Sequence, residues 1–345
     1  MPLPLSVLDL SPVSAGSTAG EALRNTLDLA RHADRLGYTR YWLAEHHNIT
    51  SIASTTPELM IGLVACETEH IRVGSGGVML PNHAPLKVVE TFRMLEALFP
   101  GRIDLGIGRA PGTDPLTAYA LRRAREGLAA DEFPEQLAEL RAFATNSFPE
   151  DHPFRAISAG SPDVPLPPIF ILGSSGYGAQ LAASLGLGCA FAHHINPQAA
   201  VFALQIYRAR FMPSPERPHP WAILAVSAAC AETEEQAEDL AASLELMYLR
   251  LRSGRPSPIT SPEEAKSYPY TPAEQAKIAE FRSNFMVGTP DVVRARLLEL
   301  AEQTGADEIM VTTVTHSHAA RVRSYELLAK AFALEPRTVG AGGAV

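Results

Sequence analysis

The sequence predicts a (β/α)8 barrel that forms a single domain over residues 1–345. Eight short apolar segments alternate with helical segments along most of the chain. In addition, the most unusual glycine, histidine and arginine residues follow these apolar segments, and barrel enzymes build their sites at the carboxyl ends of the strands. The main alternative is a doubly wound open sheet, which has the same alternation. With 46% hydrophobic and 19% charged residues, the composition is globular and also compatible with two domains.

Each predicted strand is a short apolar run bounded by turn or helix signals. The eight segments are residues 5–10, 40–45, 71–80, 102–108, 168–173, 188–193, 221–230 and 307–313. The third contains Gly76 and Gly77, which weaken a strand. A flat ligand lying on that backbone would explain these glycines, and a β-bulge is the alternative. Gly106 and Gly108 alternate in the fourth strand and clear one of its faces.

The helices between the strands are predicted from their start and stop signals. Thr18 and Glu21 form a capping box, and the helix that follows should end near Gly37. Proline in the first turn marks two further starts, at Thr56-Pro57 and Thr289-Pro290. The other helices predicted are an amphipathic helix over 84–99, the helix after the turn at 173–178, and a final helix over 324–332.

Two long segments interrupt the alternation of strands and helices. Residues 111–167 form an insertion after the fourth strand and are rich in charge and proline. Residues 250–284 follow the seventh strand and its helix, and only their last part has helical periodicity. Long loops of this kind are usually functional. We therefore expect residues 250–284 to form a mobile lid over the barrel mouth, with a packed surface excursion as the alternative.

Composition excludes several classes of partner. The net charge is −9 and no lysine or arginine block is present, so neither nucleic acid nor an anionic membrane is expected to bind. The three cysteines, Cys66, Cys189 and Cys230, are far apart and odd in number, which fits a reducing cytoplasm. The first residues do not have the pattern of a signal peptide, and no apolar run is long enough for a membrane span.

Two strand ends indicate an anion site. The fourth strand ends on Arg109, and the fifth runs into the glycine-rich turn GSSGYG at residues 173–178, which opens a helix. A helix N-terminus presents unpaired N–H groups, and an arginine adds a charge-assisted contact. The turn is neither a dinucleotide fingerprint nor a P-loop. Together the segments predict one site for a phosphorylated cofactor, whereas a tight strand-to-helix turn is the alternative for residues 173–178.

Histidines also follow the strands. His46-His47 and His193-His194 follow the second and sixth strands, and His316 and His318 follow the eighth. Neighbouring histidines on a strand point to opposite faces, and no metal-ligand spacing is present, so no metal site is expected. A histidine at a strand end can act as a base or as a hydrogen-bond donor near neutral pH, while a buried histidine satisfied by the core is the alternative.

Four longer motifs carry a resemblance to a known family. YWLAEHHN, GSGGVMLPNH, PGRIDLGIGRAPG and LGSSGYGAQLAASLG occur in this order. The chain resembles the bacterial luciferase-like flavin monooxygenases over nearly its whole length, and in particular an uncharacterised subgroup. The resemblance implies a (β/α)8 barrel with FMN at the carboxyl-terminal mouth.

The resemblance also assigns roles to individual residues. Arg109 matches the arginine that holds the FMN phosphate, and the turn that helps it matches Ser174, Ser175, Gly176 and Tyr177. A cis peptide beneath the isoalloxazine matches Gly76-Gly77, and the histidine that supports oxygen chemistry matches His46. Bacterial luciferase has a reactive cysteine where this chain has Gly108, which argues against long-chain aldehyde oxidation and light emission.

The function predicted on this basis is a monooxygenase reaction. Reduced FMN, supplied by a separate and transiently bound flavin reductase, would react with O2 to a C4a-(hydro)peroxyflavin that oxygenates a small organic substrate. Two alternatives remain open: hydride transfer with coenzyme F420, and a flavin-binding protein without catalysis.

A homodimer is predicted mainly from the resemblance. Helices 57–69 and 84–99 also carry more apolar residues than one barrel contact needs. These residues are Met60, Leu63, Val64, Met94 and Leu98.

Overall fold

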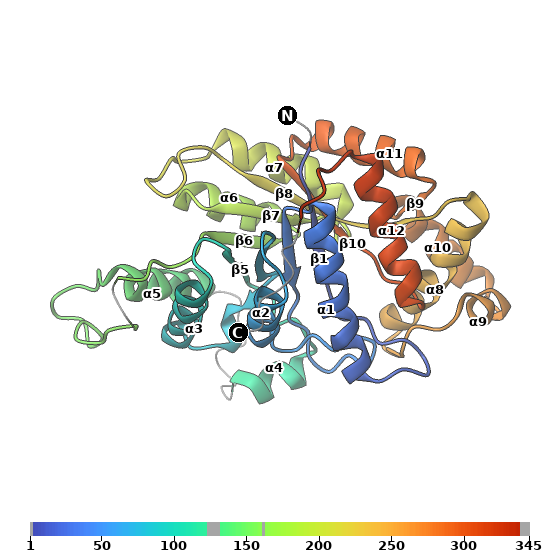
Figure 1. The fold of residues 1–345 in the computed structure, drawn as a ribbon. Helices are drawn as coiled ribbons and strands as arrows, with labels where there is room; N and C mark the ends of the chain where they lie inside the picture. The colour runs from blue at the N-terminus through green and yellow to red at the C-terminus, as the bar shows by residue number, and fades with distance from the viewer. Residues whose placement is uncertain (1–2, 123–131, 161–162, 339–345) are drawn as a thin grey trace.

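The computed structural model describes residues 3–122, 132–160 and 163–338, and its centre is a closed barrel of eight parallel strands (Figure 1). The strands of the ring are β1 (Leu5–Asp9), β2 (Arg40–Leu43), β3 (Arg72–Ser75), β5 (Ile103–Gly108), β6 (Ile169–Gly173), β7 (Gly188–Ala192), β8 (Ala222–Cys230) and β10 (Glu308–Thr312). Strand β10 pairs with both β8 and β1, which closes the ring. The predicted barrel is therefore confirmed, and an open sheet is excluded.

Two short strands extend this ring. Strand β4 (Val78–Met79) continues β3 beyond Gly76-Gly77 and pairs with β5, and β9 (Met286–Gly288) pairs with the end of β8. The prediction of one strand over 71–80 is wrong in that the two glycines interrupt it and the 3-10 helix η1 (Leu80–Asn82) ends it. Strand β9 was not predicted, because three residues are too few to show a period.

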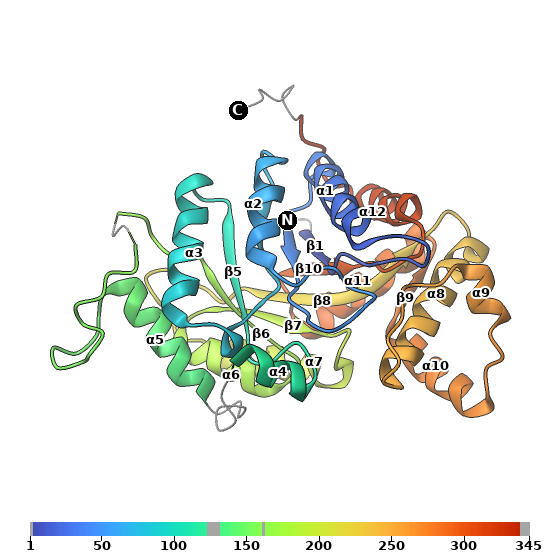
Figure 2. The same ribbon diagram turned by 90° about the horizontal axis from the view of Figure 1, so that it is seen from below.

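Helices surround the barrel and bury the outer faces of its strands (Figures 1 and 2). The helices that follow the ring strands are α1 (Ala19–Leu36), α2 (Pro57–Cys66), α3 (Pro85–Leu98), α6 (Gly176–Leu185), α7 (Ala200–Ala209, after the 3-10 helix η3, Pro197–Ala199), α11 (Pro290–Thr304) and α12 (His318–Ala331).

The capping box of Thr18 and Glu21 is present, and Gly37 ends α1 in the left-handed conformation. Thr56 precedes α2 without a capping hydrogen bond from its side chain. The last helix begins earlier than predicted, because Ser317 caps it. None of the described helices combines the length and hydropathy that a membrane crossing requires.

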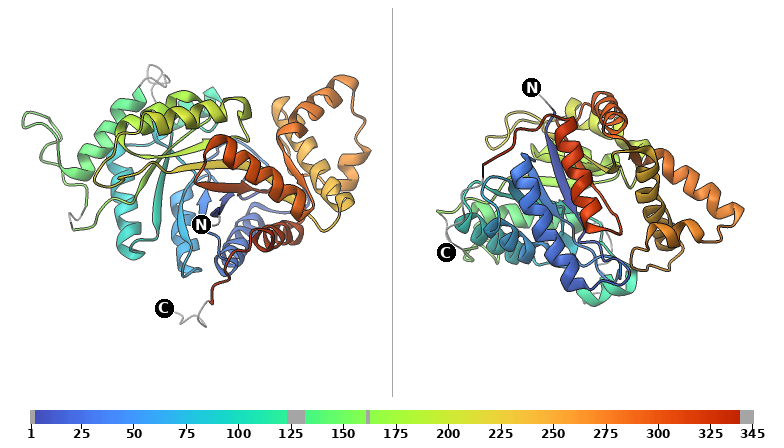
Figure 3. Two further views of the ribbon diagram at one scale, coloured as in Figure 1. Left: turned by 90° about the horizontal axis from the view of Figure 1, so that it is seen from above. Right: turned by 45° about the vertical axis from the view of Figure 1, so that its right-hand side comes forward.

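The two insertions contain more helix than the sequence indicated. Within 111–167 lie α4 (Pro115–Arg122) and α5 (Phe133–Thr145), while residues 123–131 and 161–162 of this insertion are outside the described residues. After β8, helices α8 (Glu234–Arg252), α9 (Pro262–Ser267) and α10 (Pro272–Asn284) form a group beside the barrel (Figures 2 and 3). Helix α9 was missed, although Ser261 caps it and Pro262 occupies its first turn.

The barrel interior is filled in layers, because alternate residues of each strand point inward. Buried charged groups fill the amino-terminal end, where Asp104 accepts hydrogen bonds from Arg40 and Arg72, and Arg40 also binds Glu308. Large apolar side chains fill the next layer, among them Trp42 and Phe170, whose rings lie edge to face at 5.1 Å. The barrel is thus a packed core up to the ends of the strands.

Candidate functional site

Small residues occupy several inward-facing positions at the carboxyl-terminal mouth of the barrel. Beyond the layer of Trp42 and Phe170, the alternation brings Ala44, Gly76, Gly108, Ala192 and Ala225 to the inner face, together with the larger Leu10 and Leu172. Ala44 and Ala225 pack directly on the large apolar side chains below them. This change from large to small side chains occurs at the barrel end where sites of this fold are built.

Arg109 and the glycine-rich turn come together at this mouth. The guanidinium carbon of Arg109, at the end of β5, lies 4.3 Å from the ring centroid of Tyr177 in the first turn of α6. Ser175 precedes α6 but makes no capping hydrogen bond with its side chain. Asn196 Nδ2 donates to Ser174 O at 2.9 Å and holds the turn. A cation and a helix N-terminus therefore meet at one place, which is the arrangement that binds a phosphate.

The glycines of this turn differ from Gly76 and Gly77 in their surroundings. Among the described residues, a Cβ on Gly173 would meet only the Cα of Gly178, at 3.7 Å. A Cβ on Gly76 would lie 2.6 Å from Leu8 Cδ1, and one on Gly77 would lie 2.8 Å from Gly106 O. Glycine at 76 and 77 is thus required by the barrel's own packing, whereas the turn leaves room for a ligand to approach its backbone. The Gly76-Gly77 peptide bond is cis, as the resemblance implies.

His46 lies at the mouth with one nitrogen unpaired. It follows Arg40, Trp42 and Ala44 in the inward alternation, and its N–H donates to Ser54 O at 3.0 Å. Burial, together with the neighbouring His194, lowers the pKa of His46 to about 4, so the imidazole is neutral at pH 7. Its Nδ1 is buried and has no hydrogen-bond partner in the part of the chain that the structure describes. A neutral ring with a free nitrogen can exchange a proton with a bound group.

The other histidines predicted near strand ends differ in their surroundings. Burial lowers the pKa of His193 to about 4, and its Nδ1 also lacks a hydrogen-bond partner among the residues described. His194 Nδ1 lies 3.1 Å from Ala225 O. His318 Nε2 is 2.8 Å from Asp28 and belongs to the contact between α12 and α1. In the part of the chain that the structure describes, no group of three histidine, cysteine or acidic residues could hold a metal ion.

The sequence analysis missed a carboxylate beside His46. The side chain of Glu45 is fully buried and contacts two histidines, with His47 Nε2 at 2.9 Å and His83 Nε2 at 3.0 Å. Asn82 Nδ2 also donates to it, at 3.2 Å. All four residues lie in the motifs EHH and LPNH, each of which places a histidine next to an acid or an amide. This shared feature was the signal in the sequence that could have indicated the cluster.

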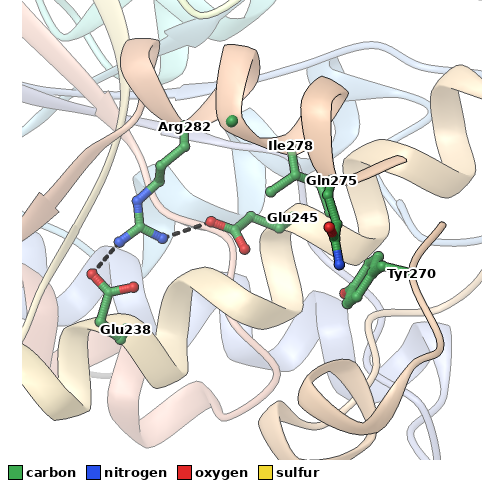
Figure 4. A pocket seen from close by; sticks show the side chains of 7 residues that line it. Glu238, Glu245, Tyr270, Gln275, Ile278 and Arg282 are labelled. Carbon is green, nitrogen blue, oxygen red and sulfur yellow. Dashed lines mark hydrogen bonds and ion pairs between the residues drawn. The ribbon is translucent and has the colours of Figure 1, made fainter. Parts of the chain in front are cut away.

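A large hollow lies within the group of helices beside the barrel. It has a volume of about 530 Å3 and lies between α8 and α10 (Figure 4). Arg282 crosses it and pairs with both Glu238 and Glu245, which leaves its charges satisfied. We place the candidate site at the barrel mouth rather than here, because an arginine beside a helix N-terminus and buried polar atoms without a partner among the described residues lie at the mouth, whereas only size distinguishes the hollow.

Comparison with known proteins gives the family. The model of the luciferase-like monooxygenases matches residues 3–308. The chain belongs to the luciferase-like monooxygenase family. A luciferase-like monooxygenase of Escherichia coli K12 is 43% identical over 93% of this chain and 95% of its own. The N-acetyl-S-alkylcysteine monooxygenase of Bacillus subtilis is 36% identical, over 95% of this chain and 97% of its own length.

Solved structures support the fold of this luciferase-like monooxygenase. The crystal structure of apo-MsnO8 is 40% identical, with a TM-score of 0.88 over 97% of this chain and 100% of the other. Two more distant structures share the fold. The oxygenating constituent of 3,6-diketocamphane monooxygenase from Pseudomonas putida, in complex with FMN, is 20% identical with a TM-score of 0.70, over 96% of this chain and 97% of that one. An F420-dependent secondary alcohol dehydrogenase is 13% identical with a TM-score of 0.65, over 96% and 99%.

Proposed function

We propose that this luciferase-like monooxygenase binds reduced FMN at the barrel mouth and uses O2 to oxygenate a small organic substrate. The observation that carries the proposal is the meeting of Arg109 with Tyr177 at the N-terminus of α6, at the ends of adjacent strands. Reduced flavin comes, in this proposal, from a separate reductase. FMN would supply the chemistry of oxygen activation, and the protein would supply binding, orientation and exclusion of water.

The residues at the mouth fit a flavin nucleotide. Arg109 and the turn Ser174, Ser175, Gly176 and Tyr177 would hold the phosphate, and Gly76-Gly77 would lie beneath the ring system. Three buried polar atoms near the strand ends have no hydrogen-bond partner among the described residues: His46 Nδ1, His193 Nδ1 and Thr312 Oγ1. Buried polar atoms are normally hydrogen-bonded, so these atoms support a polar ligand at the mouth.

His46 would be the proton-handling residue beside the cofactor. Its neutral ring can donate one proton or accept one at its unpaired Nδ1. The layer of Trp42 and Phe170 below closes the barrel to water from the other end. Together these features would keep the reacting atoms dry and within reach of one titratable group.

Two alternatives are separated by simple measurements. The fold shared with an F420-dependent dehydrogenase keeps hydride transfer with F420 open. Oxidised F420 absorbs near the violet edge and FMN in the blue, so the spectrum of the protein with each cofactor distinguishes them. Oxygen uptake with reduced FMN and a panel of substrates distinguishes a monooxygenase from a protein that only binds flavin.

Substitution of Arg109 tests the phosphate site. We expect Arg109→Ala to weaken FMN binding by about 1.5–3 kcal/mol, the range of a hydrogen bond to a charged group. Titration of flavin fluorescence measures the affinity. The control is Arg323→Ala, which removes an arginine paired with Glu232 and Glu326 on the outside of the protein. Equal FMN affinity in wild type and Arg109→Ala would contradict the placement.

We also propose a homodimer that buries the outer face of α2 and α3. Two of the residues expected there are in fact core residues, since Met60 and Val64 are buried. The exposed apolar residues are Leu59 (64% exposed), Leu63 (45%), Met94 (64%) and Leu98 (67%). Large apolar side chains grouped in this way on neighbouring helices typically mark an interface.

The Leu98→Glu variant tests this dimer. We expect it to raise the dissociation constant by roughly 100-fold or more, because dimerisation would bury an unpaired charge. Sedimentation measures the species present. The matched control is Leu251→Glu, at a leucine 41% exposed on α8. A wild-type protein that sediments only as the 37.1 kDa monomer would refute the dimer.

We further propose that residues 250–284 act as a lid. The start of this segment lies at the mouth, because Ile259 exchanges backbone hydrogen bonds with Val13 and Ala15 in the loop after β1, and Thr50 Oγ1 donates to Pro256 O. We expect limited proteolysis to cut first within 250–284, and FMN to slow this cleavage. First cleavage elsewhere, or the same rate with and without FMN, would favour a packed excursion.

A further inference from the structure

The side chain of Glu45 connects three loops at the barrel mouth. We propose that Glu45 is a positioning residue that fastens the loop after β3 to the loop after β2 and thereby fixes His46 in place. The hydrogen bonds of Glu45 support the connection between the loops. The effect on His46 rests on the proposed function.

Glu45 collects donors from two loops that are separate in the sequence. From the segment after β3, which includes β4 and η1, Met79 N–H donates to its Oε2 at 2.8 Å, and Asn82 Nδ2 and His83 Nε2 reach Oε1 at 3.2 and 3.0 Å. From its own loop, His47 Nε2 lies 2.9 Å from Oε1. The carboxylate is fully buried, so these contacts take the place of the hydrogen bonds that water would donate to it.

The third loop, after β5, joins the same network. Asn82 Nδ2 also donates to Pro111 O at 3.0 Å, and Gly112 O accepts from His47 N–H at 3.2 Å. Thr113 Oγ1 donates to His47 O at 2.9 Å. A Cβ on Gly112, whose φ is +66°, would lie 2.8 Å from Glu45 O, so only glycine allows this close approach.

The network surrounds His46 on both sides of the chain. Glu45 and His47 lie on one side of the chain, since His47 Nε2 is 2.9 Å from Glu45 Oε1, and alternation along extended backbone would turn His46 to the other side. The network therefore holds both neighbours of His46. Its own N–H is held by Ser54 O. Loss of the Glu45 carboxylate would release the two residues that fix the direction of the His46 ring.

Charge strengthens the fastening. Burial alone would raise the pKa of Glu45, but hydrogen bonds from His47 and His83 outweigh it and lower the pKa to about 2. Burial alone would lower the pKa of His83, but its hydrogen bond to Glu45 and the charges of Glu45 and Glu58 raise it. A raised pKa makes His83 easier to protonate. A hydrogen bond between a protonated histidine and an ionised carboxylate is stronger than one between neutral groups.

Glu45→Gln is the variant that tests the proposal. Glutamine has nearly the size of glutamate but only one acceptor oxygen. The donors that share two carboxylate oxygens in the wild type would have this one oxygen, so at least one contact between the loops is lost. Its control is Glu96→Gln, which changes another buried glutamate that accepts a backbone N–H, from Gly101 at 2.6 Å, on α3.

Amide hydrogen exchange of the protein without cofactor is the first readout. We expect Glu45→Gln to raise exchange at least tenfold in residues 46–54, 79–83 and 111–114, and to leave the strands of the barrel unchanged, whereas Glu96→Gln leaves these three loops as in wild type. Unchanged exchange in the three loops would overturn the fastening. If Glu45→Gln does not fold, Asn82→Ala provides the test, with the same result expected in 79–83 and 111–114.

The second readout addresses His46. We expect Glu45→Gln to keep FMN affinity within threefold of wild type and to lower kcat at least tenfold. The electrons of reduced FMN would then reduce O2 to hydrogen peroxide, with release of oxidised FMN, instead of supporting product formation. Loosened loops with an unchanged kcat would overturn the positioning of His46. If wild type itself fails to bind FMN, the proposed function fails, and the exchange measurement still decides whether Glu45 fastens the loops.

Discussion

Replacing His46 with alanine is expected to lower the rate of product formation roughly 100- to 10,000-fold, the range that a positioned acid or base contributes. The variant should bind FMN with nearly wild-type affinity, because Arg109 and the turn at 173–178 provide the phosphate contacts. His46 faces the mouth, is neutral at pH 7 and has an unpaired Nδ1. Its loss would remove a proton donor or acceptor rather than a binding group.

The measurement is the ratio of product to hydrogen peroxide formed from reduced FMN and O2 across a substrate panel. His219→Ala is the control, because that histidine is exposed in the turn before β8. Product formation at the wild-type rate in His46→Ala would show that the histidine is only structural.

The second large effect is expected on stability. Asp104 is fully buried and accepts hydrogen bonds from Arg40 Nη1 at 2.7 Å, Arg72 Nε at 2.9 Å and Trp42 Nε1 at 3.1 Å. Burial alone would raise the pKa of Asp104, but the charges of Arg40 and Arg72 keep it below its usual value. Asp104→Asn removes the charge that these two arginines share, and breaking a buried ion pair typically costs about 3–5 kcal/mol of unfolding free energy.

Urea unfolding of the two proteins measures this cost. Asp239→Asn is the control, because Asp239 pairs with Lys266 at an exposed position where ion pairs contribute little. If Asp104→Asn unfolds at the same urea concentration as wild type, the charged layer at the amino-terminal end is not a main source of stability. Oxygenation by the folded fraction should persist, since this layer lies below Trp42 and Phe170 and away from the mouth.

Features that depend on local sequence were predictable. The strand pattern predicted the barrel, and Thr18 with Glu21 predicted the start of α1, because strand burial and helix capping are encoded within a few residues. Arg109 and the turn at 173–178 were expected to meet because the strands of a barrel end at the same face, and Arg109 does lie against Tyr177.

Features that depend on distant contacts were not predictable. Glu45 is defined by contacts with His83 and Asn82, which are almost forty residues away in the chain. The close approach of Leu8 in β1 and Gly106 in β5 to Gly76 and Gly77 also depends on strands distant in the sequence. Met60 and Val64 were counted as interface residues because helical periodicity does not distinguish a face against the barrel from a face against a partner.

The position of FMN in crystals grown with the cofactor tests the central claim most directly. We expect its phosphate within hydrogen-bond distance of the Arg109 guanidinium and the N–H groups that begin α6, with the ring system against Gly76-Gly77 and within reach of His46. FMN bound at another place, such as the hollow between α8 and α10, or no FMN in the crystals at millimolar concentration, would contradict the account.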